Sequence, residues 1–347
     1  MSKRSCYSGI GGQAVLEGVM MKNNDKYAVA VRKPDGEISV EIENFPGTLH
    51  DSKIKNAPFV RGVINFVDSL LLGTKALNHS ASFFDEEEQE ETAFEKAADK
   101  VSNGHAEKLL LTLTTCFAIV LAVGIFIVLP YLLSILLRNY IRNESLVAIA
   151  EGVFRILIFL LYVWGISAMN DIKRLYQYHG AEHKCINCIE RGRELNVKNV
   201  MRSSRLHKRC GTSFIFFVML VSIVLFFFIR VDSVIWRLIF RILLMPVVAG
   251  ISYEIIRLAG RTDNIFIRIL SAPGMWIQRL TTKEPDESMI EVAMAAVEAV
   301  FDWKNYLSVN FGYVEEDETD DGDADEGVEE EDIVSNTEVD DEDNEES

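Results

Sequence analysis

The sequence predicts a mainly α-helical, polytopic membrane protein with about four transmembrane helices, a small N-terminal cytoplasmic β unit and interfacial amphipathic helices. Four apolar runs each reach the roughly 20 residues that a helix needs to cross a bilayer. The first fifty residues instead carry the turn sequences and short patterns of β-strands. Apolar patterns at helical spacing, interrupted by charges, flank the four runs, which is typical of helices at a membrane surface.

Residues 1–57 are predicted to form the cytoplasmic β-rich unit. Tyr27–Arg32 and Glu37–Ile42 lie on either side of Pro34-Asp35-Gly36, a turn sequence that favours a hairpin. Another strand is expected over Ala14–Met21. The glycines that precede it, in Gly9-Ile10-Gly11-Gly12, lack the spacing of a phosphate-binding loop, so we interpret them as positions of bending or close backbone approach.

Residues 58–108 are predicted to be an amphipathic helix and an acidic linker. Pro58–Ser80 has apolar residues at helical spacing, but Arg61 and Lys75 interrupt the pattern. Such charges favour a helix that lies in the membrane surface or packs on the bundle. The acidic run Asp85–Glu91 is expected to be solvated.

Residues 109–260 are predicted to form a four-helix membrane core that includes a cytoplasmic metal-site loop at 170–212. Pro130 is expected to kink the first span. Glu151 and Arg155 lie one turn apart in the second span, and pairing inside the bundle lowers the cost of these two charges. The four spans are predicted at Leu109–Leu137, Leu146–Met169, Ser213–Ile229 and Val234–Leu258.

Residues 261–310 are predicted to hold interfacial and cytoplasmic amphipathic helices. Ile265–Leu280 is an apolar run in which Trp276 suits the headgroup region, and Pro273-Gly274 is expected to interrupt it. Asp286–Trp303 has one apolar side and is expected to dock on the cytoplasmic body.

Residues 311–347 are predicted to be a disordered acidic tail. The formal net charge of the chain is −17, and Glu315–Glu346 holds 20 Asp and Glu with no Lys or Arg, so the remainder carries +3. A run of like charges repels itself and buries little apolar surface. The acidity therefore belongs to the tail, and the folded body is slightly basic.

The distribution of Lys and Arg predicts the orientation, because cytoplasmic loops carry the excess of basic residues. Ten basic residues lie from Lys173 to Arg209, between the second and third spans, whereas the turn between the first two spans has only Arg138 and Arg142. The middle loop and both termini are therefore expected to be cytoplasmic, in a multi-pass protein of the cytoplasmic membrane. The first hundred residues contain no pattern of a cleavable signal peptide, so the first span is expected to direct insertion.

The stretch His179-Gly180-Ala181-Glu182-His183 reads H-x-x-E-H and carries the most chemical information. On a helix, positions i and i+4 lie on one face, so His179 and His183 can bind one divalent metal ion, with zinc expected and Glu182 as the general base. The two candidates for a third ligand are Glu254, near the end of the fourth span, and His207, just before the third. Three protein ligands would leave the open position of a catalytic zinc site.

A second hypothesis is a closed structural zinc site of the ribbon or knuckle kind. Reducing surroundings disfavour disulfides in a cytoplasmic loop, which favours metal ligation by its cysteines. The two sites are compatible unless they compete for His207, and a third interpretation is that His179 and His183 only form hydrogen bonds in a packed loop. The four donors of the closed site would be Cys185, Cys188, His207 and Cys210.

Three further charged residues lie among apolar ones, and we interpret each first as an ion-pair partner. Arg257 lies one turn after Glu254, its simplest partner, and its alternative role is to bind a phosphate or carboxylate. Glu17 and Arg61 have a contact with the substrate as their alternative role.

Four motifs are distinctive enough to compare with known families: Gly11-Gly12-Gln13-Ala14-Val15-Leu16-Glu17-Gly18-Val19-Met20-Met21, His179-Gly180-Ala181-Glu182-His183-Lys184, Arg209-Cys210-Gly211-Thr212-Ser213-Phe214, and Ser252-Tyr253-Glu254 with Arg257. From about Ser8 to Trp303 the chain resembles DUF1385, a bacterial family of unknown function. The resemblance implies a membrane-bound, metal-dependent protein. The family usually has other residues at Cys185 and Cys188, and Pro at Lys208, so it does not share the four-ligand site as a general feature.

Together these patterns favour a metal-dependent membrane hydrolase with its site at the cytoplasmic face, acting on a membrane-proximal peptide or lipid. The alternative is a non-enzymatic membrane adaptor or scaffold with a structural zinc site. A transporter is the third hypothesis, because Pro130, Pro246 and Gly250 could mark broken helices, although four spans are few for that class. The lipid bilayer is the expected partner, and no nucleic-acid partner is expected.

Overall fold

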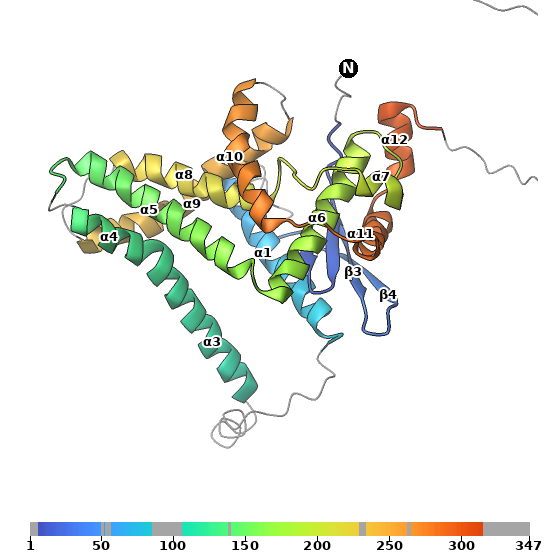
Figure 1. Ribbon diagram of the computed structural model, residues 1–347, viewed down its shortest axis with the longest axis horizontal. Helices are drawn as coiled ribbons and strands as arrows, with labels where there is room; N and C mark the ends of the chain where they lie inside the picture. Colours follow the sequence, from blue (N-terminus) through green and yellow to red (C-terminus); the bar gives the residue numbers. More distant parts are fainter. Residues whose placement is uncertain are drawn as a thin grey trace, which may run out of the picture. The chain divides into compact units, whose positions relative to one another are not determined.

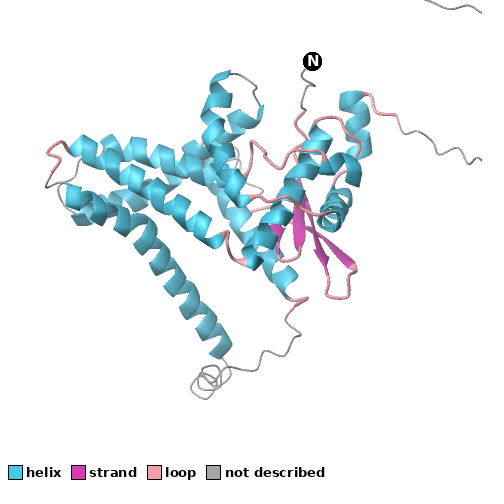
Figure 2. Cartoon of the chain, viewed as in Figure 1, coloured by secondary structure: helices cyan, strands magenta, loops and turns pink. Residues whose placement is uncertain are grey.

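The computed structural model describes residues 6–49, 52, 57–84, 106–137, 140–228, 234–261 and 265–314. Helices make up most of this part of the chain, and four strands form one sheet (Figure 2). The predicted fold class is thereby confirmed: a mainly helical chain with four helices able to span a membrane and a small N-terminal sheet. The predicted acidic run Asp85–Glu91 and the tail from Glu315 onward lie outside the described residues.

The sheet is an antiparallel meander in the order β1 (Gly11–Val15), β2 (Gly18–Asn23), β3 (Lys26–Arg32) and β4 (Ile38–Asn44). β3 and β4 form the predicted hairpin, and Gly36 has a φ of 90° in its turn. The single strand predicted over Ala14–Met21 is wrong, because the chain turns at Leu16 and Glu17 and runs back as β2. Glu17 has a φ of 48°, and a Cβ on Gly18 would lie 2.2 Å from the carbonyl oxygen of Ala30, so only glycine fits after this turn.

Both faces of the sheet are covered by helices, which explains why β2 and β3 are apolar almost throughout. Successive side chains of a strand point to opposite faces. Three helices cover the sheet: α1 (Val60–Ala81), α6 (Asn170–Glu190) and α11 (Glu287–Val300) (Figure 1). Val19 and Met21 pack in one core cluster with residues of α6 and α11, and Met20 and Val29 pack in another with residues of α1.

The four candidate spans of the described residues are Leu113–Leu137, Ser145–Ile166, Gly211–Phe228 and Ile239–Gly260. They lie in α3 (Ala106–Val123) with η2 (Gly124–Val128) and α4 (Leu129–Leu137), in α5 (Glu144–Ile166), in α8 (Gly211–Phe228) and in α9 (Val234–Arg261). The irregularity in the first span is the π-helical turn η2, directly before Leu129 and Pro130. Proline has no N–H to donate back along the helix, and a π turn accommodates such a gap.

Two prolines lie inside continuous helices: Pro246, which the transporter hypothesis would place at a broken helix, and Pro273, which was expected to interrupt its run. α9 runs through Pro246, and α10 (Ile265–Thr281) runs through Pro273-Gly274. The predicted interruption of α10 is therefore wrong. Gly274 instead allows close packing on α8, because a Cβ there would lie 2.9 Å from the Ser213 hydroxyl oxygen.

The segment 170–212, expected as a metal-site loop, is largely folded. α6 starts shortly after α5 ends at Ile166, and a short helix, α7 (Val197–Met201), follows before α8. The predicted amphipathic helix over Asp286–Trp303 corresponds to α11, whose buried side packs on the sheet and α6, followed by α12 (Trp303–Phe311). Asp286 caps α11 by accepting from the N–H of Met289 at 2.9 Å.

Candidate metal centre

His179 and His183 project from one face of α6, with their ring centroids 4.4 Å apart. The helix passes close to the segment that follows α10, because a Cβ on Gly180 would lie 2.1 Å from the carbonyl oxygen of Lys283. Glycine lowers helix stability by about 1 kcal/mol relative to alanine. Its presence inside the motif is explained by this close approach, which places the carbonyl groups of the neighbouring segment next to the His179 ring.

Backbone carbonyls orient both rings. Nδ1 of His179 lies 2.9 Å from the carbonyl oxygen of Thr281, and Nδ1 of His183 lies 2.6 Å from that of Arg205. A carbonyl oxygen only accepts, so Nδ1 carries the proton in both rings and Nε2 is the ring nitrogen available to a metal. This arrangement of ring, carbonyl and free Nε2 is the one usual for histidine ligands of metals.

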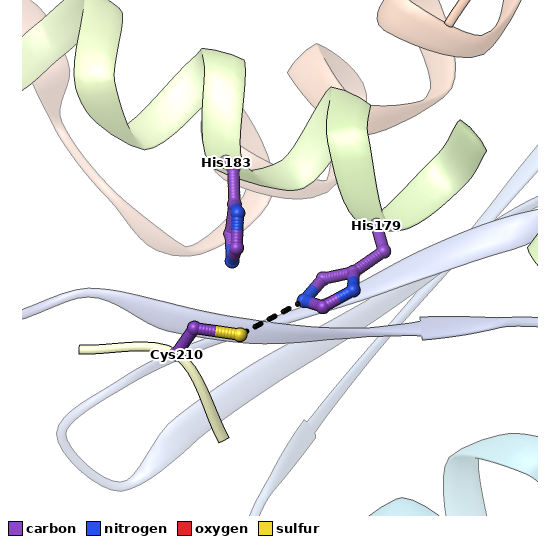
Figure 3. Close-up of side chains that lie close together, drawn as sticks. All are labelled: His179, His183 and Cys210. Carbon is purple, nitrogen blue, oxygen red and sulfur yellow. Dashed lines mark hydrogen bonds between the residues drawn. The ribbon is translucent and has the colours of Figure 1, made fainter. Parts of the chain in front are cut away.

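The third member of the group is Cys210, which directly precedes α8. Its Sγ lies 3.3 Å from Nε2 of His179 (Figure 3). The ligand atoms of His179, His183 and Cys210 all lie within 4.8 Å of one another, and no other group of this kind is found among the described residues. Glu254 or His207 was expected as the third donor, whereas the group found in the structure contains the Cys210 thiol instead.

The electrostatics of the group favour a thiolate. Burial raises the pKa of the Cys210 thiol, but His179 and His183 lower it more, to well below its usual range. Burial lowers the pKa of His179, while the Cys210 thiolate opposes this and raises the value to about 9. The N–H of Thr212 also donates to the sulfur at 3.4 Å. A thiolate is the form of cysteine that binds metals, so the sulfur is prepared as a donor.

Glu182 lies beside the group without belonging to it. Its side chain is buried, and one carboxylate oxygen, Oε2, has no hydrogen-bond partner among the described residues. The backbone N–H of Gly12 donates to this carboxylate, and a Cβ on Gly12 would lie 3.0 Å from Cγ of Glu182. The glycine-rich N-terminal motif therefore allows β1 to approach the motif on α6.

His207 is a neighbour of the group rather than a member of it. Its ring centroid lies 5.6 Å from that of His183, and its Nε2 lies 3.5 Å from a carboxylate oxygen of Glu190. Glu190 also accepts from Arg209 at 2.5 Å and from the N–H of Ser8 at 2.9 Å. Gln278 of α10 holds the backbone of His207 with both ends of its side-chain amide, at 2.9 and 2.7 Å.

Sequence reasoning missed Glu190 and Gln278. For Glu190 there was a signal, because a residue eleven positions after His179 returns to the same helical face at 100° per residue. Extending the histidine face along the helix would have found it. For Gln278 there was none, since its role depends on how α10 packs against the segment before α8.

The closed four-ligand site is not formed by the described residues. Cys185 is fully buried in the apolar core around α6 and α11. The Cys188 thiol donates to the carbonyl oxygen of Glu194 at 3.3 Å. The four proposed donors therefore lie in different places. Cys185 is in the core, Cys188 bonds to a turn, and Cys210 is in the group with His179. His207 belongs to the Glu190 network, which we define as Glu190, His207, Arg209 and Ser8.

Glu254 lies in a different ion pair. Its carboxylate accepts from Nε of Arg61 at 2.6 Å and from Nη2 of the same side chain, which joins α9 to α1. Arg257 lies 3.9 Å from the same carboxylate. The two helices approach closely here, because a Cβ on Gly62 would lie 2.7 Å from Cβ of Tyr253.

Glu17, in the turn between β1 and β2, makes two contacts with the guanidinium of Arg174 on α6. The Tyr178 hydroxyl donates to the same carboxylate at 3.3 Å. These contacts join the tip of the first hairpin to the helix that carries His179 and His183.

Comparison with known proteins gives a family but no described activity. The model of the family DUF1385, "Protein of unknown function (DUF1385)", matches residues 57–303. The chain is 37% identical over 299 residues to "Uncharacterized protein YqhQ" of Bacillus subtilis (strain 168), which covers 85% of this chain and 92% of that protein. No solved structure matches the chain.

Proposed function

The chain belongs to the DUF1385 family, and we propose that it is a zinc-dependent membrane hydrolase. The observation that carries this proposal is the meeting of His179, His183 and Cys210 beside the buried carboxylate of Glu182. Catalytic zinc sites have three protein ligands, whereas structural sites have four. In the zinc deaminases, whose zinc has mixed histidine and cysteine ligands, a glutamate that is not a ligand acts as the general acid and base.

The donor set fits zinc. Two imidazole nitrogens and a thiolate are ligands that Zn²⁺ prefers, and oxygen-seeking ions such as Mg²⁺ and Ca²⁺ do not select them. The carbonyl groups of Thr281 and Arg205 fix the two rings with Nε2 as the available atom. Zinc bound by such a set supplies a Lewis acid that polarises a carbonyl or phosphoryl oxygen and makes water a nucleophile at neutral pH.

Glu182 is suited to moving a proton. Burial raises the pKa of its carboxyl, although His183 and His179 oppose this effect. A general base is most effective when its pKa lies near the operating pH. The pKa of an exposed carboxylate lies well below neutral pH, so a raised pKa suits Glu182 to this role. The unpartnered Oε2 atom is the one available to accept a proton and return it to a leaving group.

The position of the group in the chain supports a substrate at the membrane. Cys210 directly precedes α8, and α6 starts shortly after α5, so the donors come from segments adjacent to two of the four spans. Together with the basic residues between these spans, this favours a site at the cytoplasmic face and a membrane-proximal peptide or lipid as the substrate.

The proposal is tested with purified wild type and three variants, His183→Ala, Glu182→Gln and Cys188→Ser. Zinc is measured by elemental mass spectrometry, and function by comparing membrane lipids and released peptides in cells that lack the gene and express each form. His183→Ala should lose zinc and function, and Glu182→Gln should keep zinc and lose function. Cys188→Ser should keep both zinc and function, because the Cys188 thiol only donates to the carbonyl oxygen of Glu194 in a turn.

Two outcomes would contradict the hypothesis. Wild type purified without chelators and free of zinc would exclude the metal site. A Glu182→Gln protein with full function would exclude the hydrolase and leave a metal that only stabilises an adaptor.

A further inference from the structure

A second charged cluster lies inside the membrane bundle and contains none of the residues discussed as metal donors. It consists of Glu151 and Arg155 on α5 and Arg241 on α9. The three side chains are only 8%, 11% and 13% exposed. Charged residues at such positions are costly in a bilayer, and they usually mark a functional site.

The cluster has one negative and two positive groups. Oε1 of Glu151 accepts from Nη2 of Arg155 at 3.1 Å and lies 2.7 Å from Nη1 of Arg241, and Oε2 accepts from Nη2 of Arg241 at 2.9 Å. Within the described residues, Glu151 is the acid that pairs with either arginine. The other partner of Arg155 is a neutral group, the Ser222 hydroxyl at 3.2 Å. Among the described side chains of the cluster a net charge of one remains, and a buried charge is stable only when an opposite charge compensates it.

Part of this donor capacity is unused. The Nε–H group of Arg155 is buried and has no hydrogen-bond partner among the described residues. Aromatic rings lie near the guanidinium groups: the Phe226 centroid is 5.8 Å from Cζ of Arg155 and 5.2 Å from Cζ of Arg241, and the Tyr131 centroid is 5.7 Å from the latter. Rings that stack on the faces of a guanidinium leave the N–H groups along its edges available, and these groups match the spacing of phosphate oxygens.

The depth of the cluster suits a ligand that enters from the end of the bundle opposite to Cys210. At 1.5 Å per residue, Glu151 lies about 9 Å inside the span that starts at Ser145, and Arg241 lies about 3 Å inside the span that starts at Ile239. Arg241 is therefore close to the headgroup region, and arginine side chains near a span end extend toward that region.

We propose that Glu151, Arg155 and Arg241 form a binding site for one phosphate-bearing anion, at the bundle end opposite to the candidate metal centre. The phosphate of an anionic phospholipid in the adjoining leaflet is the nearest source of such a group. The arginines would donate to the phosphate oxygens while Glu151 keeps both guanidinium groups in place.

The charge balance provides matched variants. Arg155→Gln leaves Glu151 paired with Arg241 and makes the cluster neutral, so we expect the variant to fold and to have no need of an anion. The double variant Glu151→Gln, Arg155→Gln leaves Arg241 alone and restores a net charge of one. Thermal unfolding in detergent checks that wild type and both variants are folded.

The full chain is reconstituted in nanodiscs of phosphatidylcholine with a minor share of phosphatidylglycerol, and retained phosphatidylglycerol is counted by native mass spectrometry. Wild type should retain it. Arg155→Gln should retain at least about tenfold less, because it makes the cluster neutral and removes one charge-assisted hydrogen bond. The double variant regains the net charge but lacks that hydrogen bond, so it should retain more than Arg155→Gln and less than wild type. In a second arm, delipidated protein is titrated with inorganic phosphate. Saturable phosphate binding without lipid retention, lost in Arg155→Gln, would assign the site to free phosphate. Equal retention and equal phosphate binding in wild type and Arg155→Gln would overturn the proposal.

Discussion

Sγ of Cys210 lies 3.3 Å from Nε2 of His179, although 31 positions separate the two residues in the chain. The contact joins the start of α8 to the middle of α6. His183 lies on the same face of α6 as His179 and is the third member of the group. The histidines lower the pKa of the thiol, and the thiolate raises the pKa of His179, so the contact favours a thiolate beside an imidazolium. A metal ion would replace the imidazolium proton as the positive charge next to this sulfur.

Removing the thiol should remove the metal. We expect Cys210→Ser to lower zinc affinity by more than about 100-fold, since even the loss of a group that only orients a ligand lowers affinity by 10- to 100-fold. The measurement is competition with a chromophoric chelator. Cobalt substitution adds a direct test, because the thiolate-to-cobalt charge-transfer band should be present in wild type and in Cys188→Ser and absent in Cys210→Ser. A band that persists in Cys210→Ser would identify another cysteine as the ligand.

A methyl group at Gly180 should disturb the site. The added Cβ would lie 2.1 Å from the carbonyl oxygen of Lys283, so the segment carrying Thr281 must move away from the His179 ring. We expect Gly180→Ala to lose about 1–3 kcal/mol of stability from overpacking and to lose zinc. Gly165→Ala is the matched control, because a Cβ there meets nothing within 4 Å. Thermal unfolding and zinc content check both variants, and a Gly180→Ala protein with wild-type zinc content would contradict the close approach.

Glu254 should contribute to stability but not to metal binding. Its carboxylate pairs with Arg61, and both side chains are about three-quarters buried, at 24% and 23% exposure. We expect a coupling free energy of about 1 kcal/mol in a double-mutant cycle of Glu254→Gln and Arg61→Gln, in the range measured for well-aligned, partly exposed pairs. The zinc content of Glu254→Gln should equal that of wild type. Loss of zinc in this variant would instead support Glu254 as a ligand.

Acid should weaken the Glu190 network. Burial raises the pKa of Glu190, but the hydrogen bond from His207 and the charge of Arg209 lower it by more, so that the resulting pKa is about 2. Because the folded-state pKa lies below the ordinary value of 4.5, the carboxylate stabilises the fold fully above about pH 4.5 and loses this effect as the pH falls toward 2. The contribution has an upper bound of about 3 kcal/mol.

We therefore expect Glu190→Gln to unfold at a lower temperature than wild type at pH 6, and the difference to shrink between pH 4.5 and 3. Thermal unfolding of both proteins in detergent across this window is the measurement. A difference that stays constant as the pH falls would show that the fold does not lower the pKa of Glu190.

The basic segment between the second and third spans predicts the orientation. Alkaline phosphatase is active only outside the cytoplasm, so its insertion after Asn143, between the first two spans, should give active enzyme. A fluorescent protein fused to the C-terminus should fluoresce from the cytoplasm. The reverse pair of results would put the candidate metal centre on the outer face.

Much of the local structure could be predicted from the amino-acid sequence. The apolar runs correspond to the four candidate spans, because a span requires about 20 consecutive apolar residues and no tertiary contact. The hairpin at Pro34-Asp35-Gly36 and the shared face of His179 and His183 depend likewise on near neighbours. The turn at Leu16 and Glu17 was missed, because Glu17 adopts a positive φ that its residue type rarely takes.

The amino-acid sequence by itself determined the class of protein, the four apolar spans and two of the three candidate metal donors, since each follows from spacing within a few turns of one helix. The tertiary structure decided that Cys210 joins His179 and His183, that Glu254 pairs with Arg61, and that Cys185 packs in the core. Two close approaches that glycines permit lie beside these contacts: Gly180 with Lys283 next to the His179 ring, and Gly62 with Tyr253 next to the Glu254 pair. Packing between distant elements selects which side chains meet, and spacing along the chain does not encode it.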